Sequence, residues 1–553
     1  MRASFDYIII GAGSAGCTLA NRLTEDGRTR VLLLEAGGWD RHPLLKLPLG
    51  WGKVLLDRMY DWGYDTEPEP TMSGRRIEVA RGKVIGGSSS INAMAYVRGN
   101  RADYERWAAH GLPDWSYDKV LPYFRKQESW EDGAGEYRGG SGPLATRRAR
   151  YQDPLVDAYL LAAQEQGYAL NDDYNGARQD GFARMQMTIR NGHRDSAATA
   201  TAYLRPALSR ENLTVQVNSH ATRIVIEGGR AVGVEYDHKA TRCRAAAERE
   251  VILCGGAINS PQLLMLSGIG DPAELSQHAI ALKAALPGAG KNLQDHVAAL
   301  LMYGRRDASP LLQAMRADRL VVMLAQGLVR GTGFATELPG GITGFVKSGP
   351  EQPIPDIQLL FIAGSLAAKP YMPPFSKPFV DSFACRIVLL RPKSRGAVTL
   401  ASADPTAHPK IRQNLLSNED DWSKLSAGIR IFRELAQMPT LSPHIAREIG
   451  PGAAITTENE LERYVRETAV TAHHPCGTCR MGGPDDEGAV VDSELRVRGV
   501  EALRVVDASV FPDLVGGNIN APVIMIAEKA SDLIRNSHAG SISKSWQRRE
   551  QSA

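Results

Sequence analysis

The sequence is poor in cysteine, in net charge and in long apolar runs, and each shortage excludes a class of protein. Six cysteines among 553 residues are too few for the disulfide framework of a small secreted protein. No apolar run approaches the roughly 20 residues that a membrane-spanning helix needs. A net charge of +3, without a basic stripe interleaved with aromatics, argues against a nucleic-acid-binding protein. No signal-peptide pattern is present at the N-terminus.

These shortages predict a cytoplasmic protein and leave open a peripheral contact with the inner face of a membrane. The length gives room for two or more hydrophobic cores, because domains usually contain about 100–200 residues. With 43% hydrophobic and 23% charged residues the composition is ordinary, so evidence on function has to come from motifs.

The most informative motif opens the chain. The apolar run Tyr7–Ile10 predicts a buried strand, and a G-x-G-x-x-G turn follows it at once. A helical stretch and a second apolar run, Val31–Leu34, come next and lead to Glu35. This order of strand, glycine turn, helix, strand and acidic residue is typical of the dinucleotide-binding βαβ unit. The turn consists of Gly11, Ala12, Gly13, Ser14, Ala15 and Gly16.

Each part of this unit has a physical task. Gly11 permits the tight turn, Gly13 lets the backbone approach a pyrophosphate, and Gly16 lets the helix pack on the strand. The helix start directs amide N–H groups at phosphate oxygens. Glu35, followed by Ala36, would accept hydrogen bonds from ribose hydroxyls and would repel the 2′-phosphate of NADP. The motif predicts a bound dinucleotide but does not separate FAD from NAD.

A second glycine-rich loop lies at residues 81–96, where Gly86 and Gly87 precede three serines. A helix-compatible stretch follows, so we expect unpaired N–H groups there to face a polar or anionic ligand. A serine-capped helix after a glycine turn explains the same pattern. Residues 39–70 lack periodicity and predict an extended loop, in which Trp62 either stacks on a cofactor ring or simply packs.

The middle of the chain contains strand patterns in two groups. The runs at 214–217, 221–226 and 232–236 suit an antiparallel meander, with two glycines as one of its turns. The runs at 356–363, 383–390 and 397–400 predict a sheet in a different domain.

A third group of polar residues lies near the C-terminus. His473 and His474 precede a rigid Pro-Cys-Gly-Thr-Cys turn. Further on, a predicted strand ends at Asp507, and Asn518 and Asn520 stand at the start of a predicted helix. We expect the histidine loop and the amide-rich helix start to converge on one cofactor ring.

Other interpretations of the histidine loop stay open. Adjacent histidines before a proline also occur in surface turns. A zinc site would have to draw its ligands from these histidines and from Cys476 and Cys479, and such close spacing crowds a tetrahedral site. The two cysteines also have the C-x-x-C spacing of redox disulfides, which requires a helix N-terminus in a thioredoxin-like domain.

Together, the motifs resemble those of the glucose–methanol–choline (GMC) family of FAD-dependent oxidoreductases over nearly the whole chain. Besides the N-terminal unit, the resemblance is carried by residues 82–92, 256–270, 290–296 and 391–396, by the His474 loop and by residues 518–522. Within the family, the chain is most similar to bacterial alcohol dehydrogenases that act on primary alcohols, with choline dehydrogenase next.

The resemblance implies an α/β fold with a Rossmann-like FAD-binding domain and an α+β substrate domain, whose antiparallel sheet covers the flavin. Residues 1–150, 195–310 and 470–540 are expected to form the discontinuous FAD-binding domain. Residues 151–194 and 311–469 are expected to form the substrate-binding domain, and 541–553 a frayed tail.

The resemblance also implies roles for single residues. His474 falls where the family has its catalytic histidine, and Asn518 where the second active-site residue stands. Relatives that bind FAD covalently have a histidine where this chain has Ile91, so FAD is expected to be bound non-covalently. Cofactor-contacting positions fall on Val84, Asn92, Ala93, Met94, Ala95, Thr222, Asp507, Ala508 and Asn520. Trp62 is also expected at the cofactor, and His473 is expected to be a structural or flavin-contacting neighbour of His474.

We therefore predict that a small-molecule alcohol is oxidised to an aldehyde or ketone by hydride transfer to flavin N5, with His474 as the base. Imidazole titrates near working pH and suits this task. An alcohol oxidase that uses O₂ on the same scaffold is one alternative, and a hydroxynitrile lyase with non-redox FAD is another. An NAD-dependent enzyme is disfavoured by the C-terminal motifs. The electron acceptor (quinone, another carrier or O₂) and the alcohol stay open, although no cage for choline is legible.

Overall fold

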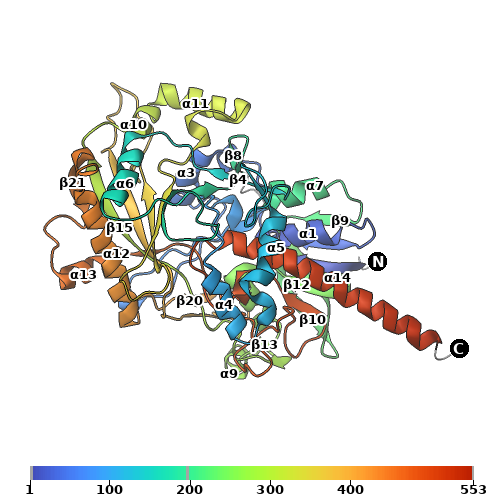
Figure 1. Cartoon of the computed structure of the whole chain (residues 1–553). Helices are drawn as coiled ribbons and strands as arrows, with labels where there is room; N and C mark the ends of the chain where they lie inside the picture. The colour runs from blue at the N-terminus through green and yellow to red at the C-terminus, as the bar shows by residue number, and fades with distance from the viewer. Residues whose placement is uncertain (1–3, 195–198, 551–553) are drawn as a thin grey trace.

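The computed structural model describes residues 4–194 and 199–550, and its two large sheets occupy opposite halves of the molecule (Figure 1). The first sheet has the strand order β10-β11-β12-β1-β2-β9, and β23 pairs with β12. The strands from β12 to β9 are parallel, whereas β10, β11 and β12 form an antiparallel meander. The bounds are β1 (Ser4–Ile10), β2 (Val31–Leu34), β9 (Leu213–Gln216), β10 (Ser219–Glu227), β11 (Arg230–His238), β12 (Thr241–Leu253) and β23 (Leu503–Val505).

The parallel part of this sheet is buried on both faces, as its continuous apolar runs require. Strand β2 is entirely buried, and so is Tyr7–Ile10 of β1. Helices α1 (Ser14–Leu23) and α14 (Asn520–Glu550) share the same core and are joined by an ion pair between Arg22 and Glu528 at 2.7 Å.

The glycine turn between β1 and α1 is tight because backbone meets backbone. A Cβ atom at Gly11, where φ is +101°, would lie 2.5 Å from the carbonyl oxygen of Cys254. A Cβ atom at Gly16 would lie 1.9 Å from the carbonyl oxygen of Gly11. No other residue fits either position, so the spacing of the motif follows from close packing of strand, turn and helix.

The second sheet is antiparallel throughout, with the strand order β21-β15-β18-β17-β16-β5 and β22 paired with β15. Its residues alternate between two faces. Leu359 belongs to the core under helices α6, α12 and α13, whereas Leu360 lines a cavity on the opposite face. The bounds are β5 (Gly181–Arg184), β15 (Val297–Arg305), β16 (Ile342–Val346), β17 (Ile357–Ile362), β18 (Ser382–Leu389), β21 (Ile445–Gly450), β22 (Val470–Thr471), α6 (Pro154–Glu165), α12 (Glu419–Gln437) and α13 (Glu458–Thr468).

Shorter elements connect the two halves. The remaining helices are α2 (Pro43–Lys46), α3 (Trp51–Leu56), α4 (Arg101–Ala109), α5 (Tyr117–Gln127), α7 (Arg205–Ala207), α8 (Gly256–Leu266), α9 (Pro272–Gln277), α10 (Pro310–Ala314) and α11 (Ala317–Arg330). Small sheets are made by β3 (Glu128–Trp130), β4 (Leu144–Arg148) and β6 (Gln186–Met187), by β7 (Ile189–Arg190) and β8 (His193–Arg194), by β13 (Ile269–Gly270) and β14 (Ala284–Ala285), and by β19 (Ala397–Thr399) and β20 (Lys410–Arg412). Among the described residues, no helix has both the length and the apolar character to cross a bilayer.

The predicted fold class is confirmed, but four local expectations are wrong. Strand β9 does not join the meander, because it pairs with the open parallel edge of β2. Strand β19 pairs with β20 outside the second sheet. Residues 39–70 contain α2 and α3, which are too short to show a helical period in the sequence. The three serines lie in a 3₁₀ turn, Gly87–Ser90, and no α-helix follows it directly.

The domain boundaries stay a prediction. Strand β15 belongs to the second sheet, so that sheet begins before the boundary expected at residue 310. Helix α14 continues to Glu550 through most of the segment expected to be frayed, and residues 551–553 lie outside the described part of the chain.

Two helical glycines make a matched test of how α12 packs on the second sheet. A Cβ atom at Gly428 would lie 2.7 Å from Cγ2 of Ile387, whereas nothing lies within 4 Å at Gly52 of α3. Alanine improves helix propensity at both sites by about 1 kcal/mol. We expect Gly428→Ala to lower the melting temperature through overpacking that costs roughly 1–3 kcal/mol. Gly52→Ala should not lower it, and equal melting curves for the two variants would contradict this packing.

Candidate active site

A cavity of about 940 Å³ is lined by residues from both sheets. The glycine turn, Glu35 and the start of β10 line one part of it, and α8 and the start of α14 contribute further along. The histidine loop after β22 and the inner face of the second sheet line another part. Helices α3, α10 and α11 complete the wall. The cavity therefore joins most of the predicted residues, which are scattered over 500 positions of the chain.

Glu35 is buried at the end of β2 and accepts hydrogen bonds from two backbone N–H groups, those of Ala12 at 2.9 Å and Gly37 at 2.8 Å. Burial nevertheless raises the pKa of its carboxyl to about 7, because two amide donors do not replace full hydration. Further donors, such as two ribose hydroxyls, would stabilise the ionised form. A buried carboxylate with a raised pKa is suited to bind a ligand that brings hydroxyl donors.

Helix α1 begins without a side-chain cap, since its N-cap residue is Gly13. Its first N–H groups therefore lack a side-chain partner at the end that lines the cavity. Close by, the hydroxyl of Ser14 donates to Oδ1 of Asn520 at 2.6 Å, which ties the starts of α1 and α14 together. The carboxylate of Asp507 accepts from Ser260 at 2.6 Å and from the N–H of Gly256 at 2.8 Å, and so holds the start of α8 beside them.

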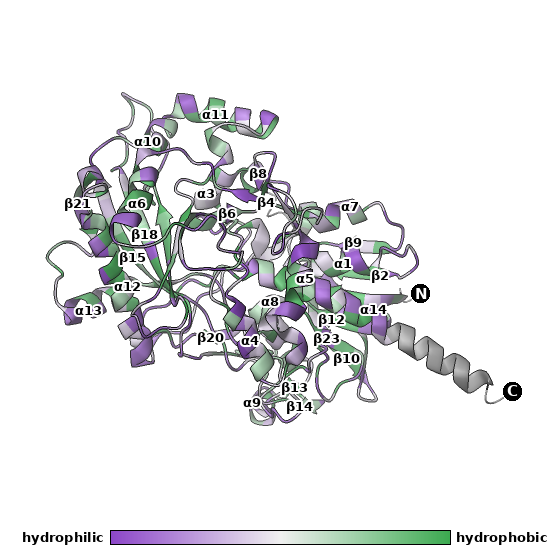
Figure 2. Cartoon of the chain, in the orientation of Figure 1, coloured by the Kyte–Doolittle hydropathy of each residue, from purple (hydrophilic) through white to green (hydrophobic). Residues whose placement is uncertain are grey.

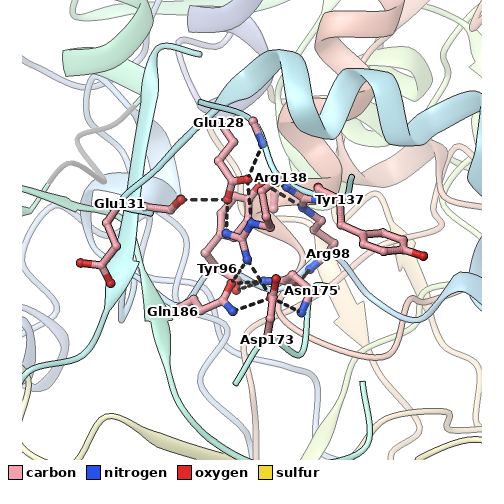
Figure 3. A network of polar contacts seen from close by, with 12 residues as sticks. Tyr96, Arg98, Glu128, Glu131, Tyr137, Arg138, Asp173, Asn175 and Gln186 are labelled. Carbon is pink, nitrogen blue, oxygen red and sulfur yellow. Dashed lines mark hydrogen bonds and ion pairs between the residues drawn. The ribbon is translucent and has the colours of Figure 1, made fainter. Parts of the chain in front are cut away.

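The segment Asn92–Ala95 lines the cavity, and a buried polar network fixes the chain just after it (Figure 3). Arg98 donates to Glu128 at 2.6 Å, and Glu128 also pairs with Arg138. Arg138 reaches Asp173 at 2.8 Å. Arg98, Glu128 and Arg138 are almost completely buried but mutually paired, so the loss of any one of them would leave a buried charge without its partner. The network thereby holds a loop without regular structure in one position beside the cavity.

The histidines form a short chain of hydrogen bonds. Nδ1 of His474 lies 2.9 Å from Nδ1 of His296, and Nε2 of His474 lies 3.1 Å from Nδ2 of Asn518. Nε2 of His296 lies 3.1 Å from the carbonyl oxygen of Leu390. The backbone N–H of His474 donates to Asp295 at 2.8 Å, so the residues just before β15 hold both the ring and the backbone.

The carbonyl oxygen of Leu390 assigns the protons along this chain, because a carbonyl can only accept. Nε2 of His296 must carry a proton, so in the neutral ring its Nδ1 is an acceptor. Nδ1 of His474 must then be the donor, which leaves Nε2 of His474 unprotonated, with a lone pair able to accept. Asn518 agrees with this assignment, because its amide nitrogen faces that lone pair while its oxygen faces Nε2 of Gln358 at 3.5 Å.

Burial keeps all three histidines of this region neutral. It lowers the pKa of His474 well below its ordinary value, and the neighbouring His296 and Arg81 lower it further. Burial likewise lowers the pKa of His296 to about 4 and that of His473 to about 3. A neutral imidazole with one unprotonated nitrogen is a proton acceptor. In His474 this nitrogen, Nε2, lies at the cavity beside the amide donor of Asn518.

Seventeen of the predicted site residues line the cavity and four do not. Ala12, Gly16, Val84 and Thr222 are buried behind it. Gly16 packs against the turn, and Ala221 and His220, not Thr222, reach the cavity from β10. The residues that line it are Gly11, Gly13, Ser14, Ala15, Glu35, Ala36, Trp62, Asn92, Ala93, Met94, Ala95, His473, His474, Asp507, Ala508, Asn518 and Asn520.

Three residues of the site were not singled out from the sequence. His296 and Asp295 lie at the end of the segment 290–296, whose residue pattern predicts no catalytic or binding role by itself. The fold brings both residues into contact with His474. Arg81 donates to the carbonyl oxygen of His473 at 2.6 Å and lines the cavity. It stands directly before a glycine-rich loop, and its contact with the histidine loop spans 392 positions of the chain, so no local pattern indicates it.

The zinc and redox interpretations of the histidine loop find no support. Within residues 4–194 and 199–550, no group of three or more His, Cys, Asp or Glu side chains is arranged to hold a metal ion. Cys476 and Cys479 are both free thiols, and burial raises the pKa of each well above its ordinary value. A buried, protonated thiol is a poor nucleophile.

The chain is similar to known proteins over most of its length. The two models of the GMC oxidoreductase family match residues 5–298 and 392–527. The oxygen-dependent choline dehydrogenase of Brucella ovis is 43% identical over 535 residues, 96% of this chain and 95% of that protein. Human mitochondrial choline dehydrogenase is 44% identical over 97% of this chain and 91% of its own length. A formate oxidase variant from Aspergillus oryzae, solved to study FAD modification, superposes with a TM-score of 0.89 at 28% identity, covering 98% of this chain and 100% of that chain.

The burial of the cysteines leads to a thiol count. Cys243 on β12 is partly exposed, whereas Cys17, Cys254, Cys385 and the pair of the histidine loop are buried. We expect Ellman's reagent to titrate one thiol per native chain and all six after unfolding. In Cys243→Ser the native reaction should vanish. Fast native reaction of Cys476 or Cys479 would contradict the inert character assigned to them.

Proposed function

The chain belongs to the GMC oxidoreductase family and acts on alcohols as an FAD-dependent dehydrogenase or oxidase, and we propose that His474 is the base of that reaction. The observation that carries the proposal is the unprotonated Nε2 of His474, whose lone pair accepts from the amide nitrogen of Asn518 at 3.1 Å on the cavity side. A substrate hydroxyl that replaces this contact donates to the imidazole and accepts from the amide. The proton then has a defined destination, and the oxygen keeps a hydrogen bond as it becomes a carbonyl.

The residues around the cavity fit FAD. Glu35 suits the ribose hydroxyls, the amides at the start of α1 suit the pyrophosphate, and Asn92–Ala95 with His473 suit the ring. Ile91 offers no group for a covalent bond, so we infer that FAD is held non-covalently. When bound, FAD supplies the two-electron oxidant that takes up the substrate hydride at N5.

We infer that the substrate is an apolar alcohol and not choline. The carboxylates that line the cavity, among the described residues, are Glu35, Asp57 and Asp507. Glu35 and Asp507 belong to the dinucleotide region, and Asp57, directly after α3, is paired with Lys53 at 2.5 Å. The second sheet, α10 and α11 add one charged side chain to the wall, Arg386, which would itself repel a quaternary ammonium. Their other lining side chains are apolar: Leu311, Leu320, Leu324, Leu360, Phe361 and Ile362. Such a wall favours a hydrocarbon chain over a quaternary ammonium.

The visible spectrum tests this reaction. We expect the purified protein to show flavin absorbance that bleaches when a medium-chain primary alcohol is added without air. Choline at the same concentration should bleach it far more slowly. Bleaching that persists in air identifies a dehydrogenase with another acceptor, and rapid recovery with peroxide identifies the oxidase alternative.

Other outcomes of the same experiment would contradict parts of the proposal. A protein without flavin would refute every function considered for this fold, and a bound flavin that no alcohol reduces would refute alcohol oxidation and favour the lyase. Faster reduction by choline would refute the apolar substrate. Acid precipitation should release the yellow cofactor into the supernatant, and colour retained in the pellet would refute non-covalent binding.

Variants of His474 test the base. We expect His474→Gln to keep the flavin spectrum and to lower kcat/KM by roughly 10²–10⁴-fold, because proton removal loses its acceptor. His444→Gln, on a partly exposed ring far from the cavity lining, is the control and should behave as the unchanged protein. Comparable activity of His474→Gln and His444→Gln would remove His474 from the mechanism.

His296 offers a pH test of the proton assignment. His296→Gln can still donate to Leu390 and accept from His474, whereas His296→Leu can do neither, so only the second should lose about 10–100-fold in kcat/KM. His474 acts as a base above its pKa, so its lowered pKa preserves activity into acidic solution. Replacing His296 removes one cause of that lowering, so the acid limb of the profile should move to higher pH in both variants. An unmoved limb would contradict the coupling.

A further inference from the structure

Helix α11 separates the cavity from the outside of the molecule and is apolar on both sides. Leu320 and Leu324 line the cavity, and Gly327 packs closely on Leu47. On the opposite side Val321, Val322 and Val329 are 68%, 63% and 82% exposed. The helix therefore presents a valine stripe to the exterior that no described residue covers. Figure 1 shows it at the outer edge of the second half of the molecule, and Figure 2 shows its mixed hydropathy.

The loop at 371–380 extends this apolar surface. It runs beside the start of α11, because the N–H of Ala317 donates to the carbonyl of Tyr371 at 2.8 Å and the N–H of Tyr371 donates to Met315 at 3.1 Å. Phe375 and Val380 of the loop are 84% and 72% exposed. We call the outer face of α11 together with this loop the apolar cap. Half of the strongly exposed large apolar side chains of the described chain belong to it: Val321, Val322, Val329, Met372, Phe375 and Val380.

Basic residues are frequent in and next to the two segments that form the apolar cap. Residues 316–330 and 369–380 contain five of them, Arg316, Arg319, Arg330, Lys369 and Lys377, against one acidic residue, Asp318. Asp318 is paired with Arg316 at 2.6 Å. This surface thus has a larger positive excess than the whole chain, whose net charge is +3. An apolar face rimmed by Lys and Arg is the pattern of a helix that lies in the interface of an anionic bilayer.

We propose that the apolar cap docks on the surface of an anionic lipid bilayer. Phe375 and the valines of α11 would enter the headgroup boundary, and the basic rim would contact lipid phosphates. A second copy of this chain fits the cap less well, because a two-fold contact would bring two positive rims together. The wall that touches the membrane is also the wall of the cavity, so an apolar alcohol dissolved in the bilayer has a short path to it.

Vesicle co-sedimentation tests the docking. We expect the holoenzyme to sediment with vesicles of phosphatidylcholine and phosphatidylglycerol, and added salt to weaken the binding. The double variant Val329→Asp with Phe375→Asp should lower the partition coefficient at least tenfold, and Arg330→Glu with Lys377→Glu should do the same for anionic vesicles. None of these four residues lines the cavity, so oxidation of a water-soluble alcohol should be unchanged.

Leu282→Asp is the matched control, since this leucine is 50% exposed between α9 and β14, outside the cap. It should bind vesicles like the unchanged protein. Absence of vesicle binding, or binding that the cap variants leave intact, would refute the proposal. So would a dimer that those variants dissociate, because the occupant would then be a second copy. Docking needs no turnover, so its failure leaves the proposed reaction untouched, and failure of the reaction leaves docking untouched.

Discussion

A buried histidine accepts a proton only if its surroundings keep the ring neutral and leave the nitrogen that faces the substrate unprotonated. Here the carbonyl oxygen of Leu390 sets that condition through two hydrogen bonds. It requires the proton of His296 on Nε2, and His296 in turn requires the proton of His474 on Nδ1, which leaves the lone pair of His474 on Nε2, at the cavity side. The rest of the site depends on this order of protons. Asn518 can point its amide nitrogen at His474 only while that lone pair exists.

The same chain of contacts explains why the site lies between two sheets. His474 follows β22, and His296 directly precedes β15, which pairs with β22. Asn518 comes instead from the turn before α14, a helix of the first core. Each half of the molecule supplies one of the two groups that flank the proposed substrate oxygen. Neither half has a complete site, so a small shift between the sheets would separate base and amide.

The sequence was most informative where one short segment contains all the constraints. The unit from β1 to Glu35 was predicted correctly because close packing restricts Gly11 and Gly16 to a single residue type. His474 and Asn518 were found through their resemblance to a family, and the structure brings them within 3.1 Å. His296 and Arg81 were not found, because their roles arise from contacts across 178 and 392 positions of the chain. Strand β9 was misplaced for the same reason, since an open edge on β2 is a property of the sheet and not of the local pattern.

Burial sets the charge state of both ends of the cavity. The low polarity that keeps His474 neutral also raises the pKa of Glu35 and would penalise an unpaired ammonium in the same cavity. A substrate that suits this environment is itself apolar and partitions from water into a lipid bilayer. Helix α11 is consistent with that demand, because leucines line the cavity on one side of it and valines face outward on the other. The low polarity around the proposed base and the exposed valines of α11 therefore both favour an apolar alcohol.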